Sequence, residues 1–223
     1  MHNDYSVFDI TGPILIGPSS SHTAGACRLA NAARAIFNRE IAHADITLFG
    51  SFAQTLFGHG TDKAIIGGLM GIRPDDEQLI DAPALAKMKH MTYRFLASDT
   101  VQTSANVVRF EMTSSEDEAM SVRGVSTGGG NIIVNQIGTT GLQISLKYNT
   151  IVVDHLDKPG AVLGVSKILA DDGINIASMN MYRHGKHDRA YMIIETDEDI
   201  PPKTLAEIRS LRKMSVIYIP KLY

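Results

Sequence analysis

A cluster of hydroxyl side chains around one histidine is the first feature of this sequence that could support chemistry. His22 is followed by one hydroxyl residue and preceded by three: Thr23, Ser19, Ser20 and Ser21. At the start of a helix, hydroxyls and free backbone N–H groups favour a negative group such as a substrate carboxylate. His22 could hold or transfer a proton near neutral pH. The alternative is a helix cap with more serines than capping needs.

A second histidine lies between two glycines, in the sequence Gly-His-Gly-Thr-Asp-Lys of residues 58–63. Glycine on both sides of His59 lets the backbone approach a ligand and leaves the imidazole uncovered. The alternative interpretation is a tight turn that carries an exposed histidine. The sequence therefore offers two candidate histidines on separate segments.

Three further features give weaker signals. The glycines of residues 128–130 could form an anion nest, but the spacing of a phosphate loop is missing, which favours a hairpin loop. His184 and His187 have no further Cys/His pair to complete a zinc site, so a solvated hairpin tip is the better interpretation. Cys27 is the single cysteine. Neither a disulfide nor a cysteine-based metal site can therefore be completed within this chain.

Composition excludes several classes of function. The 223 residues carry a formal net charge of −3 and 44% hydrophobic residues, which is ordinary for a globular protein of one or two domains. No run of Lys or Arg exceeds two residues, so no nucleic-acid partner is expected. No apolar stretch is long enough to cross a bilayer, and the N-terminus lacks a signal-peptide pattern. We therefore expect a cytoplasmic protein without a membrane partner.

The elements that must position these motifs fall into two domains, residues 1–148 and 149–223. The first domain has an Ala-rich helix from about Thr23 to Phe37, a strand at 45–49, and a helix capped by Thr61 or Asp62. Four alternating segments follow, and their short connections favour an antiparallel meander. They occupy residues 92–97, 107–112, 130–137 and 141–147. The first domain is therefore predicted to be α+β.

The second domain has a pattern that is easier to interpret. Strand-like segments are expected at residues 150–154, 175–182, 190–195 and 216–219. Helical spacing occupies residues 161–172, and a second helix is expected after Pro201. The order strand, helix, strand, strand, helix, strand is that of a ferredoxin-like βαββαβ domain. One face of such a sheet is free to pack against a partner.

Taken together, the two histidine motifs resemble the beta chain of bacterial iron–sulfur-dependent L-serine dehydratase, an L-serine ammonia-lyase that does not use pyridoxal phosphate. GPSSSHTAG at 17–25 and GHGTDKA at 58–64 carry this resemblance, which covers essentially the whole chain. The second domain resembles ACT domains, especially that of phosphoglycerate dehydrogenase, through residues 155–160, 173–177 and 197–199. The first domain is similar to the allosteric-substrate-binding-like fold found beside that ACT domain in some of those dehydrogenases.

The resemblance implies conversion of L-serine to pyruvate and ammonia with a [4Fe–4S] cluster. In that family, one iron lacks a cysteine ligand and acts as a Lewis acid on the serine hydroxyl, while a base removes the α-proton. Cluster ligation needs several thiolates. Cys27 lies in an Ala-rich helix, where a small buried side chain is the simplest interpretation. The resemblance therefore implies that a partner alpha chain holds the cluster, and no metal ligand is expected here.

By motif match, the resemblance also assigns site residues. His22 and His59 are expected to face the alpha-chain active site as catalytic residues, although the sequence leaves open which of them transfers a proton. Residues expected to bind substrate or shape its pocket are Ser19, Ser20, Ser21 and Thr23. Residues expected to support His59 beside the substrate are Thr61, Asp62 and Lys63.

In the ACT domain, His155, Asp157 and Asn175 are expected to bind a small amino acid such as L-serine. His155 and Asp157 lie where the first strand meets its loop, and Asn175 opens the second strand, which predicts that the three converge at one end of the sheet. In phosphoglycerate dehydrogenase the position of Asp157 is an asparagine, so this chain adds a negative charge. A two-fold interface could complete the site, since an ACT sheet edge can pair with its copy. The alternative is an assembly domain without a ligand.

A function of another class also remains open, that of a free-standing amino-acid sensor without catalysis. The serine-rich helix start and the His59 turn favour the enzyme subunit, because a sensor would not need them. A self-sufficient hydrolase that uses Ser21 and His22 is disfavoured. Adjacent residues at a helix start point in divergent directions, and no oriented acid is evident.

Overall fold

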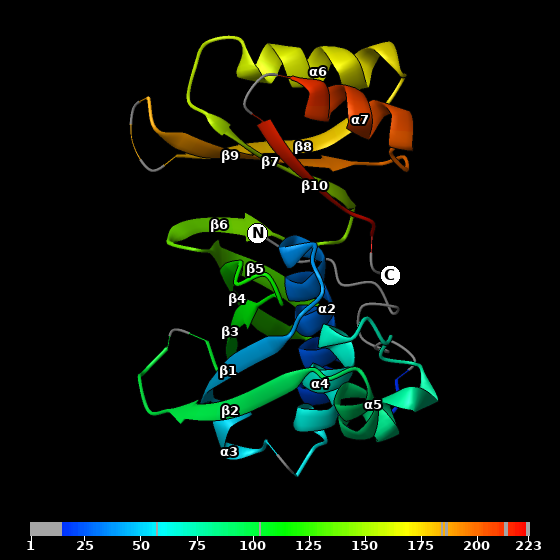
Figure 1. The fold of residues 1–223 in the computed structure, drawn as a ribbon, viewed down its shortest axis with the longest axis vertical. Helices are drawn as coiled ribbons and strands as arrows, with labels where there is room; N and C mark the ends of the chain where they lie inside the picture. The colour runs from blue at the N-terminus through cyan, green and yellow to red at the C-terminus, as the bar shows by residue number, and fades with distance from the viewer. Residues whose placement is uncertain are drawn as a thin grey trace, which may run out of the picture. The chain divides into compact units, whose positions relative to one another are not determined.

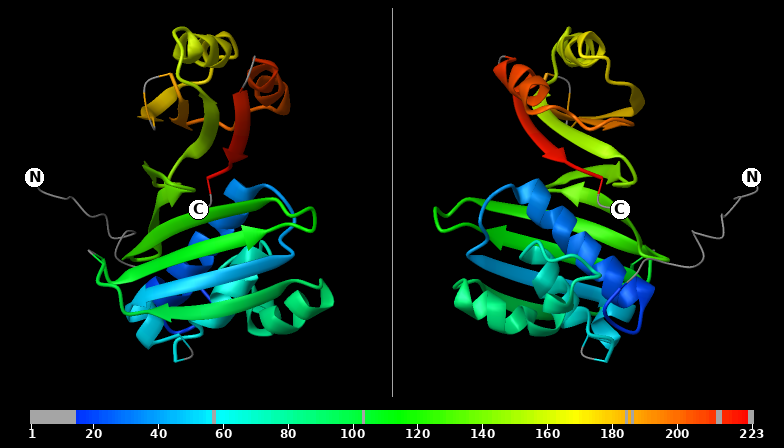
Figure 2. Two further views of the ribbon diagram at one scale, coloured as in Figure 1. Left: turned by 60° about the vertical axis from the view of Figure 1, so that its left-hand side comes forward. Right: turned by 90° about the vertical axis from the view of Figure 1, so that its right-hand side faces the viewer.

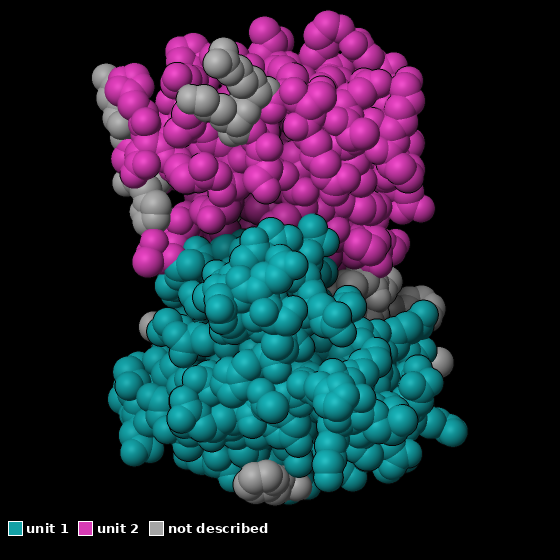
Figure 3. Space-filling view, viewed as in Figure 1, with its two compact units in different colours: residues 1–138 teal, residues 139–223 magenta. Residues whose placement is uncertain are grey.

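The chain forms two compact units, residues 1–138 and 139–223, which Figure 3 colours separately. The computed structural model describes residues 15–56, 58–102, 104–183, 185, 187–211 and 214–221. The units divide after Gly138 rather than after residue 148, where the sequence pattern put the domain boundary. The short strand β6 (Thr140–Ile144) therefore belongs to the second unit.

The helices of the first unit begin with an irregular turn. A π-helical turn, η1 (Ser20–Ala24), continues directly into α2 (Gly25–Phe37), so the predicted Ala-rich helix is longer at its N-terminus than expected. Four shorter helices follow: α3 (Ser51–Gln54), α4 (Thr61–Leu69), η2 (Glu77–Asp81) and α5 (Ala82–Met88). Neither Thr61 nor Asp62 caps α4, because its N-cap is Gly60, in the left-handed region at φ 67°.

Within the first unit, a sheet with the strand order β2-β1-β3-β4-β5 supports these helices (Figure 1). Its strands are β1 (His43–Gly50), β2 (Thr92–Ser98), β3 (Asn106–Thr113), β4 (Ala119–Gly128) and β5 (Asn131–Ile137). Antiparallel pairing is found for β3, β4 and β5, but β4, which lies between the predicted segments at 107–112 and 130–137, was not predicted. The predicted meander is wrong for β2, which pairs in parallel with β1. The reason is that α4 and α5 connect these two strands, and a helical crossover returns the chain in the same direction.

Small residues let the helices of the first unit pack closely on one face of the sheet (Figure 2). On β1, Ile46 and Leu48 are fully buried and alternate with half-buried residues. The long side chain of Leu29 on α2 covers Gly124, where a Cβ would lie 2.4 Å from Leu29 Cδ2. Each fully buried Leu or Ile contributes about 1.5–3 kcal/mol to stability. This packing fixes α2, and with it the turn that carries His22.

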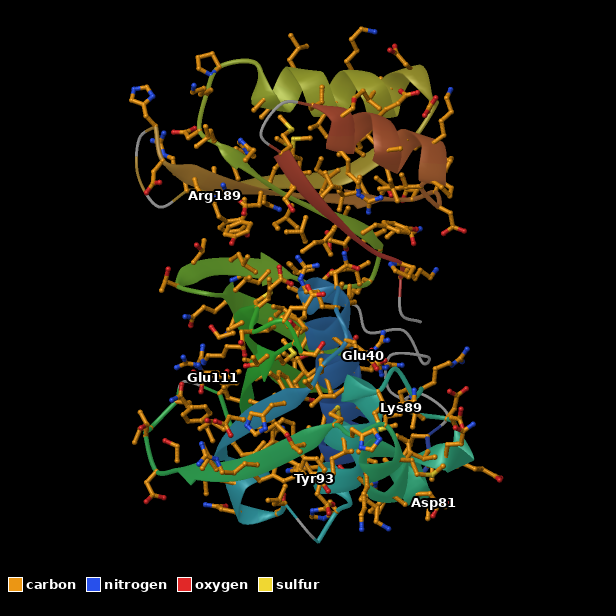
Figure 4. The ribbon with its side chains drawn as sticks, viewed as in Figure 1. Glu40, Asp81, Lys89, Tyr93, Glu111 and Arg189 are labelled. Carbon is orange, nitrogen blue, oxygen red and sulfur yellow. The ribbon has the colours of Figure 1, made fainter. Side chains whose placement is uncertain are left out.

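The second unit has the element order expected of a ferredoxin-like domain. It comprises β7 (Asn149–Leu156), α6 (Ala161–Asp171), β8 (Ile176–Arg183), β9 (Arg189–Thr196), α7 (Pro202–Ser210) and β10 (Met214–Ile219). Its sheet has the order β10-β7-β9-β8, and both helices cover one face (Figure 1). Arg189, labelled in Figure 4, donates from Nε to Asp154 Oδ1 over 2.8 Å and so links β9 to β7. The predicted α+β class is therefore confirmed for the chain.

The tip of the β8–β9 hairpin is only partly described. The predicted solvated tip includes His184 and Lys186, which lie outside the described residues. Among the helices of the described part of the chain, none is both long enough and apolar enough to cross a membrane.

Candidate functional site

The N-terminal turn of the first unit holds His22 by both ring nitrogens. Ser19 caps the turn, since its Oγ accepts the His22 backbone N–H over 3.1 Å, and the same Oγ lies 3.3 Å from His22 Nδ1. On the other side of the ring, Nε2 forms a 2.8 Å hydrogen bond with Ser51 Oγ. His22 is therefore fixed between two hydroxyls from separate segments.

The second motif meets the first at Thr23 and His59. Thr23 Oγ1 donates to the His59 carbonyl oxygen over 2.9 Å, which ties the glycine-flanked turn to η1. The His22 and His59 rings have centroids 5.2 Å apart and are tilted by 35°. The buried Phe52 ring meets His22 edge-on at 5.5 Å. The structure thus brings together the two histidines that the sequence motifs singled out.

His22 favours its neutral form. Burial lowers the pKa of His22 below its ordinary value of 6.5, and the positive charge that His59 can carry lowers it further. A neutral imidazole has one N–H donor and one acceptor nitrogen. His22 is therefore suited to hydrogen bonding at pH 7 rather than to carrying a charge.

His59 has an unused buried atom. His59 Nδ1 is buried, and no described residue forms a hydrogen bond with it. Since buried polar atoms are almost always paired, an unpaired ring nitrogen is a candidate contact for a bound molecule. His59 also lines a small pocket of about 110 Å³ with Thr23 and Lys63. The rest of that pocket is mainly apolar, with Pro18 and Ile80 among its walls.

The other motif residues lie around this centre with different exposures. Thr61 is fully buried, and its Oγ1 forms no hydrogen bond with any described residue. Asp62 is half-buried and Lys63 is exposed. Ser20 and Ser21 are half-buried in η1.

The glycine triplet supports the site rather than forming it. Gly128 ends β4, and residues 129–130 turn the chain into β5, so the prediction of a hairpin loop is confirmed. Ser126 on β4 donates from Oγ to the Ser21 carbonyl over 3.0 Å. A Cβ on Gly25 would lie 2.2 Å from Ser126 Oγ. The hairpin therefore packs tightly against η1 and holds its shape.

Sequence reasoning missed Ser51 altogether, and it included Ser126 only as part of the glycine-rich segment 126–131, without a contact to the His22 turn. Ser51 is 29 residues from His22, and Ser126 is 105 residues from Ser21. Neither serine belongs to a histidine-bearing motif. Only the pairing of β1, β3 and β4 brings them to the same place.

Cys27 is unsuited to bind a cluster. Its side chain is fully buried, and its Sγ donates to the Ile72 carbonyl over 3.3 Å. Burial raises the pKa of Cys27 to about 12, so the thiol stays protonated. In the described part of the chain, no three His, Cys, Asp or Glu side chains are grouped as a metal site. These residues do not fit an iron–sulfur cluster.

In the second unit, His155 lies beside a cavity of about 400 Å³. His155 is 1% exposed, and its Nδ1 donates to the Leu156 carbonyl over 2.8 Å, while Nε2 contacts no described hydrogen-bond partner. Lys158 and the start of α6 at Gly160–Ala161 also line the cavity. Asp157 precedes Lys158 in the sequence and forms an ion pair with Arg183. Burial opposes ionisation of Asp157, but hydrogen bonds from the His187 backbone and from Arg183 lower its pKa.

Asn175 does not lie at this end of the sheet, so the predicted convergence of the three residues within one chain is wrong. β7 and β8 run in the same direction, because each is antiparallel to β9. Through β9, His155 aligns with Arg183, whereas Asn149 aligns with Ile176. Asn175 is therefore roughly 20 Å away along the strands. Its side chain donates to Asp197 Oδ2 over 2.6 Å.

The fold and this paired-histidine site define a two-domain chain in which an α+β unit with a candidate active site precedes a ferredoxin-like ACT domain. The family model of the serine dehydratase beta chain matches residues 6–137, and that of the ACT domain matches residues 149–213. The chain belongs to the serine dehydratase beta-chain family.

Named relatives agree with this membership. "Probable L-serine dehydratase, beta chain" of Bacillus subtilis (strain 168) is 38% identical over 217 residues, 97% of either chain. "L-serine dehydratase, beta chain" of Peptoniphilus asaccharolyticus is 33% identical over 215 residues, 95% of this chain and 96% of the relative. "L-serine dehydratase" of Streptomyces coelicolor is 47% identical over only 74 residues, 31% of this chain and 16% of the relative.

Proposed function

We propose that this chain is the beta subunit of a cytoplasmic L-serine dehydratase, which converts L-serine to pyruvate and ammonia together with an alpha chain. The observation that carries the proposal is the meeting of His22 and His59, with rings 5.2 Å apart, at the two motifs of a serine dehydratase beta-chain fold. The names of the full-length relatives support the same substrate.

The [4Fe–4S] cluster is proposed to reside on the alpha chain. The single cysteine of this chain is buried and protonated, whereas a cluster needs several thiolates. The beta chain would then contribute protein groups to a shared active site. The description of the two full-length relatives as beta chains supports such a partner.

Within the shared site, this chain would bind and orient the substrate and supply one proton-transfer group. Both ring nitrogens of His22 already contact serine hydroxyls, whereas His59 Nδ1 has no hydrogen-bond partner among the described residues. His59 is therefore the better candidate for the proton transfer, and His22 for positioning. Lys63 and the hydroxyls of η1 would attract the substrate carboxylate.

Purification with and without the partner tests the proposal. The chain alone should be colourless and should not deaminate L-serine. Coexpression with an alpha chain, followed by anaerobic reconstitution, should give a brown complex that forms pyruvate. Serine deamination by the purified chain without iron would contradict the assignment.

We also propose that the ACT domain binds a small amino acid such as L-serine at His155. Because the Leu156 carbonyl can only accept, the proton of a neutral His155 ring is on Nδ1, and Nε2 is left as an acceptor. A ligand hydroxyl or ammonium group could donate to it, while Lys158 and the start of α6 favour a carboxylate. Asn175 could take part only from a second copy of the chain, which fits self-association through the ACT sheet.

Calorimetric titration of the full chain with L-serine tests the effector site. Binding should weaken in His155→Gln and in Asn175→Ala, while Asn180→Ala, an exposed asparagine on β8, serves as the matched control. No heat at millimolar L-serine would leave the domain as an assembly element. Binding by the chain alone, without any activity in the alpha–beta complex, would favour the free-standing sensor instead.

A further inference from the structure

Ser51 is held in place by the backbone around it. It is the first residue of α3, and its N–H donates to the Ala105 carbonyl over 2.8 Å. The preceding Gly50 has φ 57° and ψ −130°, and a Cβ there would lie 2.5 Å from the Ala105 oxygen. Thr55 donates its backbone N–H and its hydroxyl to the Ser51 carbonyl. These contacts aim the Ser51 side chain at His22.

The hydrogen bonds of His22 with Ser19 and Ser51 can leave one hydroxyl proton without an acceptor. A neutral imidazole offers one donor and one acceptor, but two serine hydroxyls contact it, at 3.3 Å from Ser19 and 2.8 Å from Ser51. Ser19 Oγ accepts the His22 backbone N–H and keeps a proton that can point to Nδ1. In the Nε2–H tautomer of His22, Ser19 therefore donates to Nδ1, and Nε2–H donates to Ser51 Oγ. In that tautomer no described residue accepts the Ser51 hydroxyl proton.

We propose that Ser51 is a substrate-binding residue whose hydroxyl donates to a carboxylate oxygen of the bound amino acid. His22 positions it, because accepting from Nε2–H directs the remaining Ser51 proton away from the ring. A carboxylate only accepts hydrogen bonds, so it matches a Ser51 hydroxyl whose proton has no other acceptor. The inference rests on the proposed function and adds a residue that lies outside both histidine motifs.

Kinetics on the alpha–beta complex test the contact with substrate. Ser51→Ala should raise the KM for L-serine by roughly ten- to a hundredfold with a smaller change in kcat, as expected for a lost hydrogen bond to a charged group. Ser51→Thr, which keeps the hydroxyl, should recover most of the loss. Ser98→Ala on β2, which removes a half-buried hydroxyl that donates to Thr100, is the control. An unchanged KM in a folded Ser51→Ala complex would overturn the proposal.

A second measurement needs neither the partner nor activity. In the beta chain labelled with ¹⁵N-histidine, NMR should show the Nε2–H tautomer of His22 in the wild type and a change at Nε2 in Ser51→Ala. An Nδ1–H tautomer in the wild type would overturn the hydrogen-bond arrangement. If the wild-type complex is inactive, the proposed function itself fails, and the imidazole signals still decide how Ser51 and His22 are bonded.

Discussion

At the scale of single residues, the site depends on which polar atoms are already engaged. His22 contacts Ser19 and Ser51 through its two ring nitrogens, and His59 has a buried nitrogen without a described partner. The two histidines of the site therefore differ in their hydrogen bonding. That difference leads to three predictions.

Replacement of either histidine should impair catalysis far more than folding. His22→Ala and His59→Ala should each lower activity by roughly a hundredfold or more, for His59 through lost proton transfer and for His22 through lost positioning of the substrate. Thermal unfolding of the beta chain should change little, because both side chains are only half-buried. Steady-state kinetics on the alpha–beta complex provide the measurement. Near-normal kcat and KM in both variants would give the histidines a structural role.

The pKa of His22 should respond to His59, but only in part. Burial is the larger cause of the lowered pKa, and the charge of His59 is the smaller. In His59→Asn, the pKa of His22 should therefore rise while staying below 6.5, as measured by NMR titration of the beta chain. A pKa that does not move would exclude coupling between the rings.

The lowered pKa of His22 also determines the direction in which the free energy of unfolding changes with pH. Below pH 6.5 the unfolded chain binds a proton at His22 before the folded chain does, so this contribution to the free energy of unfolding is lost as the pH falls. It is fully present above that value. His22→Asn should flatten this part of the stability profile.

At the scale of elements, backbone geometry builds the site from short irregular segments. The π-helical turn η1 presents His22, the turn after β1 presents Ser51, and the β4–β5 hairpin braces η1 through Ser126. π-Helical turns inside α-helices occur mostly as single turns, frequently at functional sites. Gly50, at the end of β1, combines a positive φ with a close approach to the backbone of Ala105.

Gly50→Ala should be strongly destabilising. Its φ of 57° is disfavoured for any L side chain, and a Cβ would collide with the backbone oxygen of Ala105. We expect a loss of roughly 2–4 kcal/mol, since strained backbone and overpacking each cost about 1–3 kcal/mol. Gly138→Ala is the matched control, with the same φ and open space around its Cβ. Equal losses in urea denaturation would show that the contact with Ala105 has no effect.

At the scale of the whole molecule, the chain combines a serine dehydratase beta-chain unit, which carries the candidate site, with an ACT domain. The first unit has a single cysteine, which is buried, whereas an iron–sulfur cluster needs several thiolates. The cavity at His155 gives the second unit room for a small ligand.

Replacement of Cys27 tests whether the cluster is ligated without this chain. Cys27→Ala should leave the iron and sulfide content of the reconstituted complex unchanged, because the thiol is buried and protonated. It should lower stability by about 1 kcal/mol through lost packing. Iron and sulfide analysis of both complexes gives the result. A loss of iron in a folded variant would assign Cys27 to the cluster.

Local patterns in the sequence predicted the longer helices and most of the strands, together with the two histidine motifs. Strand and helix periodicity identified the βαββαβ order of the second unit, and the glycine- and serine-rich contexts marked His22 and His59. The pattern around residues 119–128 did not reveal β4. Its alternation is broken by Gly124 and by register shifts on both sides of it.

Only the tertiary structure decided which residues meet. Ser51 reaches His22, and Ser126 reaches Ser21, because strands distant in sequence pair in one sheet. The helix after Gly60 was predicted from its local pattern, but the strand at 92–97 was assigned to an antiparallel meander, whereas β2 pairs in parallel with β1. Asn175 is separated from His155 because β7 and β8 run in the same direction, and the two residues lie at opposite ends of these strands. Strand direction in the sheet, rather than position along the chain, determines which end each residue occupies.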